Sequence, residues 1–214
     1  MNNAAEYKTA AAAGESLIVE KRSKFIGICA PVSGREAALG FIGKVRAVHS
    51  GADHNVSAYY LREGNISHCS DDGEPSGTAG RPALDALQKA GIIDAAVVVT
   101  RYFGGTLLGT GGLTRAYSAA AAAAVKAAGV AVMTLCRKYS VVVDYALYDQ
   151  IMKLYADTGV RVDSSDFTEK VTINCTIKKT GETMFLDITR EISRGAADMV
   201  FIEEEFLPLK LIQR

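Results

Sequence analysis

The sequence has no excess of charge of either sign, because 24 of its 214 residues are lysine or arginine and 24 are aspartate or glutamate. A nucleic-acid-binding protein usually carries a basic excess, so the net charge gives no argument for such a partner. The chain also lacks the run of roughly 18 uncharged apolar residues that a membrane-spanning helix needs, and its start lacks a signal-peptide pattern. These absences predict a cytoplasmic protein without a membrane partner.

Motifs for catalysis or metal binding are missing as well. The four cysteines form no C-x-x-C pair, which argues against a compact zinc or redox site and fits reduced thiols. The three histidines, His49, His54 and His68, match no metal-ligand spacing. No stretch fits a nucleophile elbow, a Walker loop or a complete Rossmann fingerprint. We therefore expect no catalytic residue and no metal ligand.

The residue patterns that are present predict an α+β protein, and 49% hydrophobic residues suffice for a packed core. We expect a flexible lead-in over 1–14, an N-terminal domain over 15–130, a linker at 129–134 and a C-terminal domain over 135–208. Apolar spacing and β-branched content predict N-terminal strands at 16–20, 24–31, 55–62 and 92–100 and helices at 35–49, 81–90 and 111–128. In the C-terminal domain the order βαββαβ is that of the ferredoxin-like split unit, with helices at 145–158 and 181–193.

Glycine is concentrated in two stretches, 69–82 and 101–117, which enclose one helix and one apolar strand. Glycine is favoured where φ is positive or where something approaches the backbone closely. In the second stretch, free amides at the start of a long helix and nearby arginines predict an anion site. Its candidate residues are Arg101, Tyr102, Gly104, Gly105, Gly109, Thr110, Gly111, Gly112 and Arg115. A purely structural role, as a tight strand-to-helix turn, is the alternative.

The first stretch contains three carboxylates within four residues, Asp71, Asp72 and Glu74. Such oxygens could hold magnesium beside a substrate phosphate. Alternatively, the aspartates cap backbone amides or pair with Arg81 or Arg101, and capping is the favoured interpretation because Asp-Gly turns so often satisfy themselves. If Arg101 and Arg115 face these acids, much of the predicted anion site is neutralised internally.

Lys21, Arg22 and Lys24 form a small basic patch beside Phe25 in the sequence. Such a patch can contact RNA phosphate, or it can be an ordinary solvated hairpin turn. Because a second basic cluster is expected at Arg101 and Arg115, the patch is retained as a candidate RNA contact.

Three stretches together resemble the IMPACT (YigZ-like, UPF0029) family: KRSKFI at 21–26, SDDGEP with GTAG between 70 and 80, and RYFGG with LG between 101 and 109. The resemblance covers nearly the whole chain. It implies an N-terminal domain like domain 2 of ribosomal protein S5 and a C-terminal domain similar to a ribosome-facing domain of elongation factor G. It also implies that the acidic loop, with Asp71, Asp72, Gly73, Glu74 and Thr78, belongs to the family's motif.

The resemblance further implies a role in translation. Eukaryotic members of the family regulate translation by binding a partner of a stress kinase, through an extra N-terminal domain that this chain lacks. For bacterial members it implies association with nucleic acid or the ribosome. We therefore expect a non-catalytic protein that contacts RNA, the ribosome or a translation-related protein through the glycine-rich face of its N-terminal domain. The alternative is a magnesium-dependent enzyme acting on a phosphorylated or nucleotide substrate.

Overall fold

The structure is a computed structural model that describes residues 5–212, without the side chains at positions 210 and 212. The described residues divide into two compact units, one formed by 7–132 with 209–212 and the other by 5–6 with 133–208. Each combines helices with an antiparallel sheet, so the predicted α+β class is confirmed. No helix within residues 5–212 is long and apolar enough to cross a membrane.

The first unit is built on a five-stranded sheet of order β2-β3-β6-β4-β5 in which every neighbouring pair is antiparallel. Its elements, in chain order, are β2 (Gly14–Glu20), β3 (Ser23–Pro31), α1 (Arg35–Val48), β4 (His54–Leu61), β5 (Ile66–Ser70), α2 (Gly80–Ala90), β6 (Ala95–Tyr102) and α3 (Gly109–Ala128). A 3-10 turn, Glu63–Asn65, joins β4 to β5.

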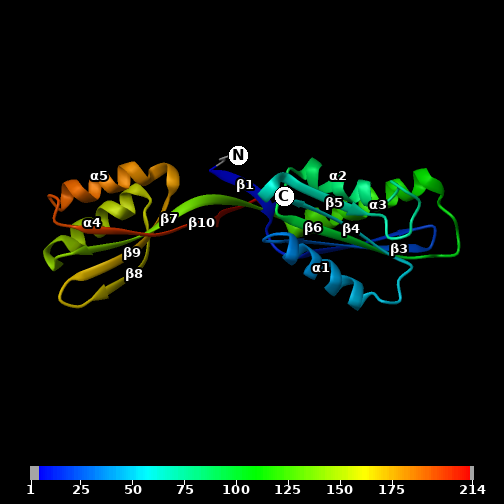
Figure 1. The fold of residues 1–214 in the computed structure, drawn as a ribbon, viewed down its shortest axis with the longest axis horizontal. Coiled ribbons are helices and arrows are strands. Elements are labelled where there is room, and N and C mark those ends of the chain that lie inside the picture. Colours follow the sequence, from blue (N-terminus) through cyan, green and yellow to red (C-terminus); the bar gives the residue numbers. More distant parts are fainter. Residues whose placement is uncertain (1–4, 213–214) are drawn as a thin grey trace. The chain divides into compact units, whose positions relative to one another are not determined.

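The central strand β6 is apolar because both of its faces are covered. The helices α2 and α3 lie on one face of the sheet and α1 on the other (Figure 1). Since side chains alternate along a strand, Val97 and Val99 enter the core under α2 and α3. Ala96 and Val98 enter the core under α1. This alternation decides which way the strand's last residues, Arg101 and Tyr102, point.

Small residues let the alanine-rich α3 lie close to the sheet. A Cβ added to Gly27 on β3 would come within 2.6 Å of the Ala120 carbonyl oxygen. The Ser16 hydroxyl on β2 donates to that same carbonyl at 2.9 Å. Close packing at this point fixes the position of the helix, and with it the position of the helix's first turn.

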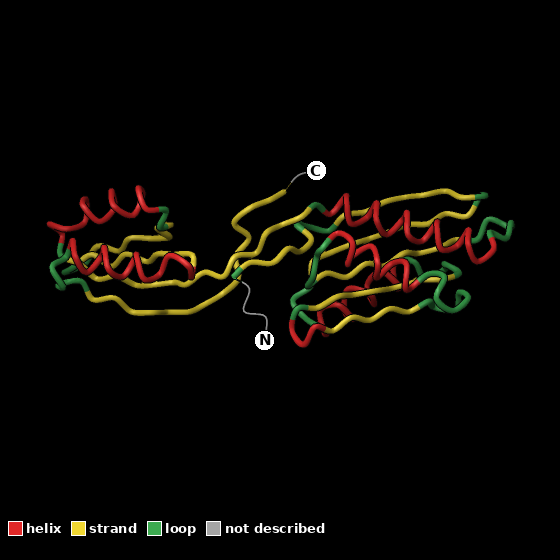
Figure 2. Tube along the Cα trace, turned by 90° about the horizontal axis from the view of Figure 1, so that it is seen from above, coloured by secondary structure: helices red, strands yellow, loops and turns green. Residues whose placement is uncertain are grey.

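The second unit follows the predicted βαββαβ order with β7 (Val130–Val143), α4 (Tyr145–Thr158), β8 (Arg161–Phe167), β9 (Val171–Lys178), α5 (Glu182–Ile192) and β10 (Asp198–Ile212). The strand β7 pairs with β9 and also with β10, and β9 pairs with β8. The helices α4 and α5 lie side by side on one face (Figures 1 and 2). Their buried side chains meet those of the sheet in a core around Tyr155 and Phe185.

Three local expectations differ from the structure. Residues 6–10 of the expected flexible lead-in form β1 (Glu6–Ala10), because this segment pairs with β7. The Lys8 carbonyl also accepts from the Ile93 amide at 2.9 Å, and the Thr9 hydroxyl donates to the Asp94 carbonyl. Residues 1–4 of that lead-in lie outside the described residues. The expected linker at 129–134 is mostly strand, because β7 begins at Val130. The edge strand β5, which pairs with β4, was not predicted.

Candidate functional site

The two glycine-rich stretches meet at the end of the sheet where β6 stops. The register pairs Phe25 with Arg101 and Lys24 with Tyr102 across β3 and β6, and it pairs His54 with Arg101 across β4 and β6. By the alternation described above, Arg101 points under α3. Tyr102 points to the α1 side, where its hydroxyl lies 3.0 Å from Nδ1 of His49.

Arg101 is buried and paired with Glu74. Its Nη1 donates to Glu74 Oε1 at 2.6 Å, and the side chains are only 6% and 3% exposed. The Tyr117 hydroxyl on α3 donates to the same oxygen at 2.8 Å. Burial, followed by the hydrogen bond to Glu74, raises the pKa of Tyr117 well above its usual value. Arg101 is thus neutralised internally, as the sequence left open, and it is not presented to solvent.

One polar atom in this cluster has no partner. Arg101 Nε is the single buried side-chain nitrogen or oxygen within the described residues that makes no hydrogen bond. The guanidinium carbon instead lies over two aromatic rings, 5.5 Å from the centre of Phe25 and 5.3 Å from that of Phe103. Cation–π attraction therefore takes the place of further hydrogen bonds.

Asp71 caps the loop that leads into α2. Its carboxylate accepts from the amides of Gly77 at 2.8 Å, Ala79 at 3.0 Å and Gly80 at 2.8 Å. Burial works against the charge, but these three amide bonds outweigh it and lower the pKa of Asp71. The Thr78 hydroxyl closes the same loop by donating to the Pro75 carbonyl at 2.7 Å. The capping interpretation of the acidic loop is therefore the one that the geometry supports.

Asp72 also uses both of its oxygens within the protein. It accepts from Arg46 on α1 at 2.7 Å and from the Asn55 amide at 2.6 Å, while its carbonyl lies 2.8 Å from Nδ1 of His54. The next residue, Gly73, has a φ of 89°. Among residues 5–212 there is no cluster of three or more His, Cys, Asp or Glu side chains that could hold a metal ion. The carboxylate oxygens of Asp71 and Asp72 thus accept hydrogen bonds from groups of the protein itself.

The turn between β2 and β3 carries the basic patch. Lys21 and Arg22 have φ of 45° and 67°, and Glu20 pairs with Ser23 around them. A two-residue hairpin with both φ positive normally uses Asn-Gly, and a side chain in this conformation costs roughly 1–2 kcal/mol. Two cationic residues are therefore kept here despite a conformational cost.

The start of α3 lies next to this turn. Lys21 and Arg115 line one hollow of about 270 Å³, together with Gly112 and one carboxylate, that of Glu20. The first amides of a helix, here those of Gly109, Thr110 and Gly111, have no intrahelical acceptor. No side chain caps the helix start at Leu108 either. A Cβ added to Gly111 would lie 3.6 Å from Arg115 Nη1, which places that guanidinium beside the first turn.

Four cations thus border the turn, Lys21, Arg22, Lys24 and Arg115. None of them forms an ion pair with any part of the chain that the structure describes. We call Lys21 and Arg115 together with the first turn of α3 the hairpin–helix face. Arg22 and Lys24 line a second hollow beside Tyr102, and Lys24 lies on the α1 side because it pairs with Tyr102. Of the two arginines predicted for the anion site, only Arg115 belongs to the hairpin–helix face.

The loop after β6 is fastened to the hairpin. A Cβ at Gly104 would lie 2.1 Å from the Arg22 carbonyl carbon, so only glycine fits without a shift. The Gly104 amide donates to the Ser23 hydroxyl at 3.1 Å, and the Phe103 amide donates to Asp53 at 2.7 Å. Gly105 has a φ of 77°, which also favours glycine.

Sequence reasoning missed four members of the site, Arg46, Asp53, Phe103 as an exposed ring, and Tyr117. Phe103 stands within the motif itself. The only sequence signal for its role is its position two residues after Arg101, because strand alternation places both side chains on the same side. Arg46 and Asp53 come from distant segments and carry no motif. Their roles follow from tertiary packing alone.

Comparisons with known proteins agree on one family. The Impact N-terminal domain profile matches residues 21–125. The chain is similar to the IMPACT family member YvyE of Bacillus subtilis (strain 168), at 36% identity over 90% of this chain and 89% of that protein. It is 34% identical to the IMPACT family member YigZ of Escherichia coli (strain K12), over 86% and 92% of the two chains.

A more distant relative and a solved structure also match the chain. Protein IMPACT-A of Xenopus tropicalis is 37% identical over 43% of this chain and 30% of its own length. A solved structure described as a hypothetical protein aligns with a TM-score of 0.62 at 32% identity, over 94% of this chain and all of that one. The glycine-rich stretches that meet at the end of β6 fall within the matched domain, and the chain belongs to the IMPACT family.

Proposed function

We propose that this protein is a non-catalytic RNA-binding protein of the translation apparatus, and that the hairpin–helix face contacts RNA phosphates. The observation that carries the proposal is that two unpaired cations, Lys21 and Arg115, stand beside uncapped helix amides, with Arg22 and Lys24 on the same hairpin, although the chain as a whole has no net charge. Amides at a helix start and nearby lysines or arginines are the groups that proteins use to hold phosphate. The link to translation is what family membership suggests.

The enzyme alternative has less support. A magnesium site in the acidic loop would need free carboxylate oxygens, whereas Asp71, Asp72 and Glu74 are engaged with amides, arginines and a tyrosine hydroxyl. A thermal-unfolding series with magnesium and nucleotides addresses it, because a ligand at one hundred times its dissociation constant adds about 2.7 kcal/mol of stability. We expect a flat response.

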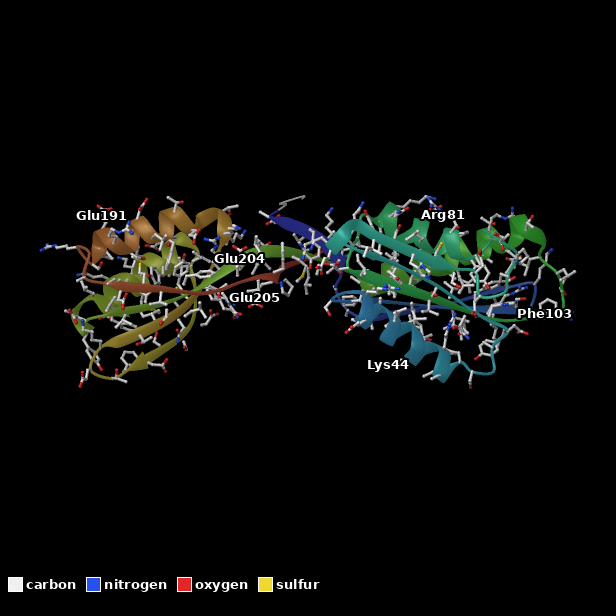
Figure 3. The ribbon with its side chains drawn as sticks, in the orientation of Figure 1. Lys44, Arg81, Phe103, Glu191, Glu204 and Glu205 are labelled. Carbon is white, nitrogen blue, oxygen red and sulfur yellow. The ribbon has the colours of Figure 1, made fainter. Side chains whose placement is uncertain are left out.

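The test of RNA binding is the salt dependence of affinity. We expect binding to purified ribosomes and to a structured RNA to weaken as salt rises, and Lys21→Ala with Arg115→Ala to flatten that dependence. Each lost phosphate contact lowers the slope of log K against log salt by about 0.7 to 0.9. The matched control is Lys44→Ala with Lys89→Ala, which removes two exposed lysines from α1 and α2 (Figure 3 shows Lys44) and the same charge.

The outcome separates three possibilities. A smaller slope in the hairpin–helix variant alone supports the proposal. Equal effects in both variants would mean that the protein's general charge, and not this face, attracts RNA. If the affinity for ribosomes changes neither with salt nor on loss of these side chains, the protein recognises a ribosomal or associated protein instead.

A further inference from the structure

Phe103 is a large apolar ring that packing alone does not explain. It follows β6 directly and lies at the end of the first unit (Figure 3), with 45% of its surface exposed. Its inner side meets the Arg101 guanidinium, whose carbon lies 5.3 Å from the ring centre. Arg101 is in turn held by Glu74. The ring therefore stands on a buried, fixed cation and turns its remaining surface outward.

The backbone that carries this ring is held on both sides. Hydrogen bonds from the Phe103 and Gly104 amides end on Asp53 and on Ser23, and the close approach of Gly104 to Arg22 leaves no space for the loop to slide. A ring on such a support loses little conformational freedom when a ligand stacks on it. The exposed surface of Phe103 is thus organised in advance for a flat partner.

Cations stand next to the ring. A hollow of about 320 Å³ is lined by Phe103, Tyr102 and Ile26 together with Arg22 and Lys24. An aromatic surface beside two unpaired cations matches the two parts of a nucleotide, a flat base and a phosphate. Proteins that bind single strands combine these same two elements, a cationic path for the backbone and aromatic rings on which bases stack.

We infer that Phe103 is the stacking platform for an unpaired base, and that Arg22 and Lys24 hold the adjoining phosphates, so that the protein selects single-stranded or looped RNA over duplex. The inference rests on the proposed function, and it adds the class of RNA that this end of the first unit takes. In a duplex the bases are already stacked inside the helix, and they reach an aromatic side chain only at loops, bulges and ends. Arg101 is a positioning residue here, since it supports the ring and touches no ligand.

The experiment compares two RNA probes of equal length at one salt concentration by fluorescence anisotropy. One is an unstructured oligonucleotide, and the other is a duplex whose ends are closed by non-nucleotide linkers, so that it presents no unpaired base. We expect Phe103→Ala to weaken binding of the unstructured probe by about 5- to 150-fold, the fold-change that corresponds to one base stacked on an aromatic side chain. Its effect on binding of the duplex probe should stay within about twofold.

Two further variants control for shape and for apolar surface. Phe103→Tyr keeps the ring and should retain the affinity. Leu107→Ala removes an 82% exposed apolar side chain from the same loop and should change neither probe. The salt dependence of Phe103→Ala should equal that of the wild type, because no charge is lost.

The results distinguish failure of this inference from failure of the proposed function. If Phe103→Ala affects both probes equally or neither, stacking is refuted, while a salt slope that still depends on Lys21 and Arg115 leaves RNA binding in place. If neither probe binds in a salt-dependent way, both are overturned.

Discussion

The buried pair of Glu74 and Arg101 provides a sharp test of how this site is held together. The substitution Glu74→Gln keeps the shape of the side chain and an acceptor for Tyr117, but it removes the negative charge. At an effective dielectric constant of about 20, two unit charges 2.6 Å apart attract by about 6 kcal/mol. Desolvation of both ions offsets much of this, yet the loss of one partner leaves the other charge buried alone, at a cost of about 3–5 kcal/mol.

The free energy of unfolding of the first unit is best measured by native-state hydrogen exchange of the β6 amides, because two units need not unfold together. The control variant is Asp85→Asn, which breaks the exposed Arg81–Asp85 pair on α2. An exposed i,i+4 pair contributes about 0.3–0.5 kcal/mol. We expect the two substitutions to differ by at least a few kcal/mol.

A double variant completes the cycle. Glu74→Gln with Arg101→Met removes both charges and leaves an apolar chain of similar length, so most of the lost stability should return. If Glu74→Gln costs no more than Asp85→Asn, then water or a rearrangement compensates Arg101, and the argument that this pair supports Phe103 fails.

Two other perturbations follow from the same geometry. Gly104→Ala should destabilise the first unit by about 1–3 kcal/mol, because the new Cβ meets the Arg22 backbone at 2.1 Å. The control Gly40→Ala, on the exposed side of α1, meets nothing within 4 Å and should stabilise the unit by about 0.5–1 kcal/mol. Urea unfolding measures both variants, and a tolerated Gly104→Ala would contradict the close packing of loop and hairpin. Asp71→Asn should cost about 1.5 kcal/mol at pH 7 through weaker amide bonds. Because the pKa of Asp71 is lowered on folding, its stabilisation is complete above the unfolded value of about 3.9 and is lost as the pH falls through the folded value. The difference between wild type and variant should therefore close in strong acid, and a gap that stays constant with pH would argue against a role for the charge.

Much of this protein was determined by its sequence alone. Apolar runs and helical spacing predicted the α+β class, the central strand β6 and the βαββαβ order of the second unit, because these patterns record which faces are buried. The glycines marked the turns at Gly73, Gly105 and Gly109, where φ is positive. The basic residues at 21–24 were also identified, because the sequence alone shows charged side chains in a turn.

Tertiary structure alone decided which charges remain available. Arg101 and Arg115 look equivalent in the sequence, but alternation along β6 turns Arg101 inward to an acid 27 positions away, while Arg115 stays on the exposed side of α3. The strands β1 and β5 and the early start of β7 were equally hidden. The strand β1 pairs with β7, far along the chain, and β5 is a mostly exposed edge strand without an apolar pattern. Composition and spacing record burial, but only packing determines which side chain a buried charge meets.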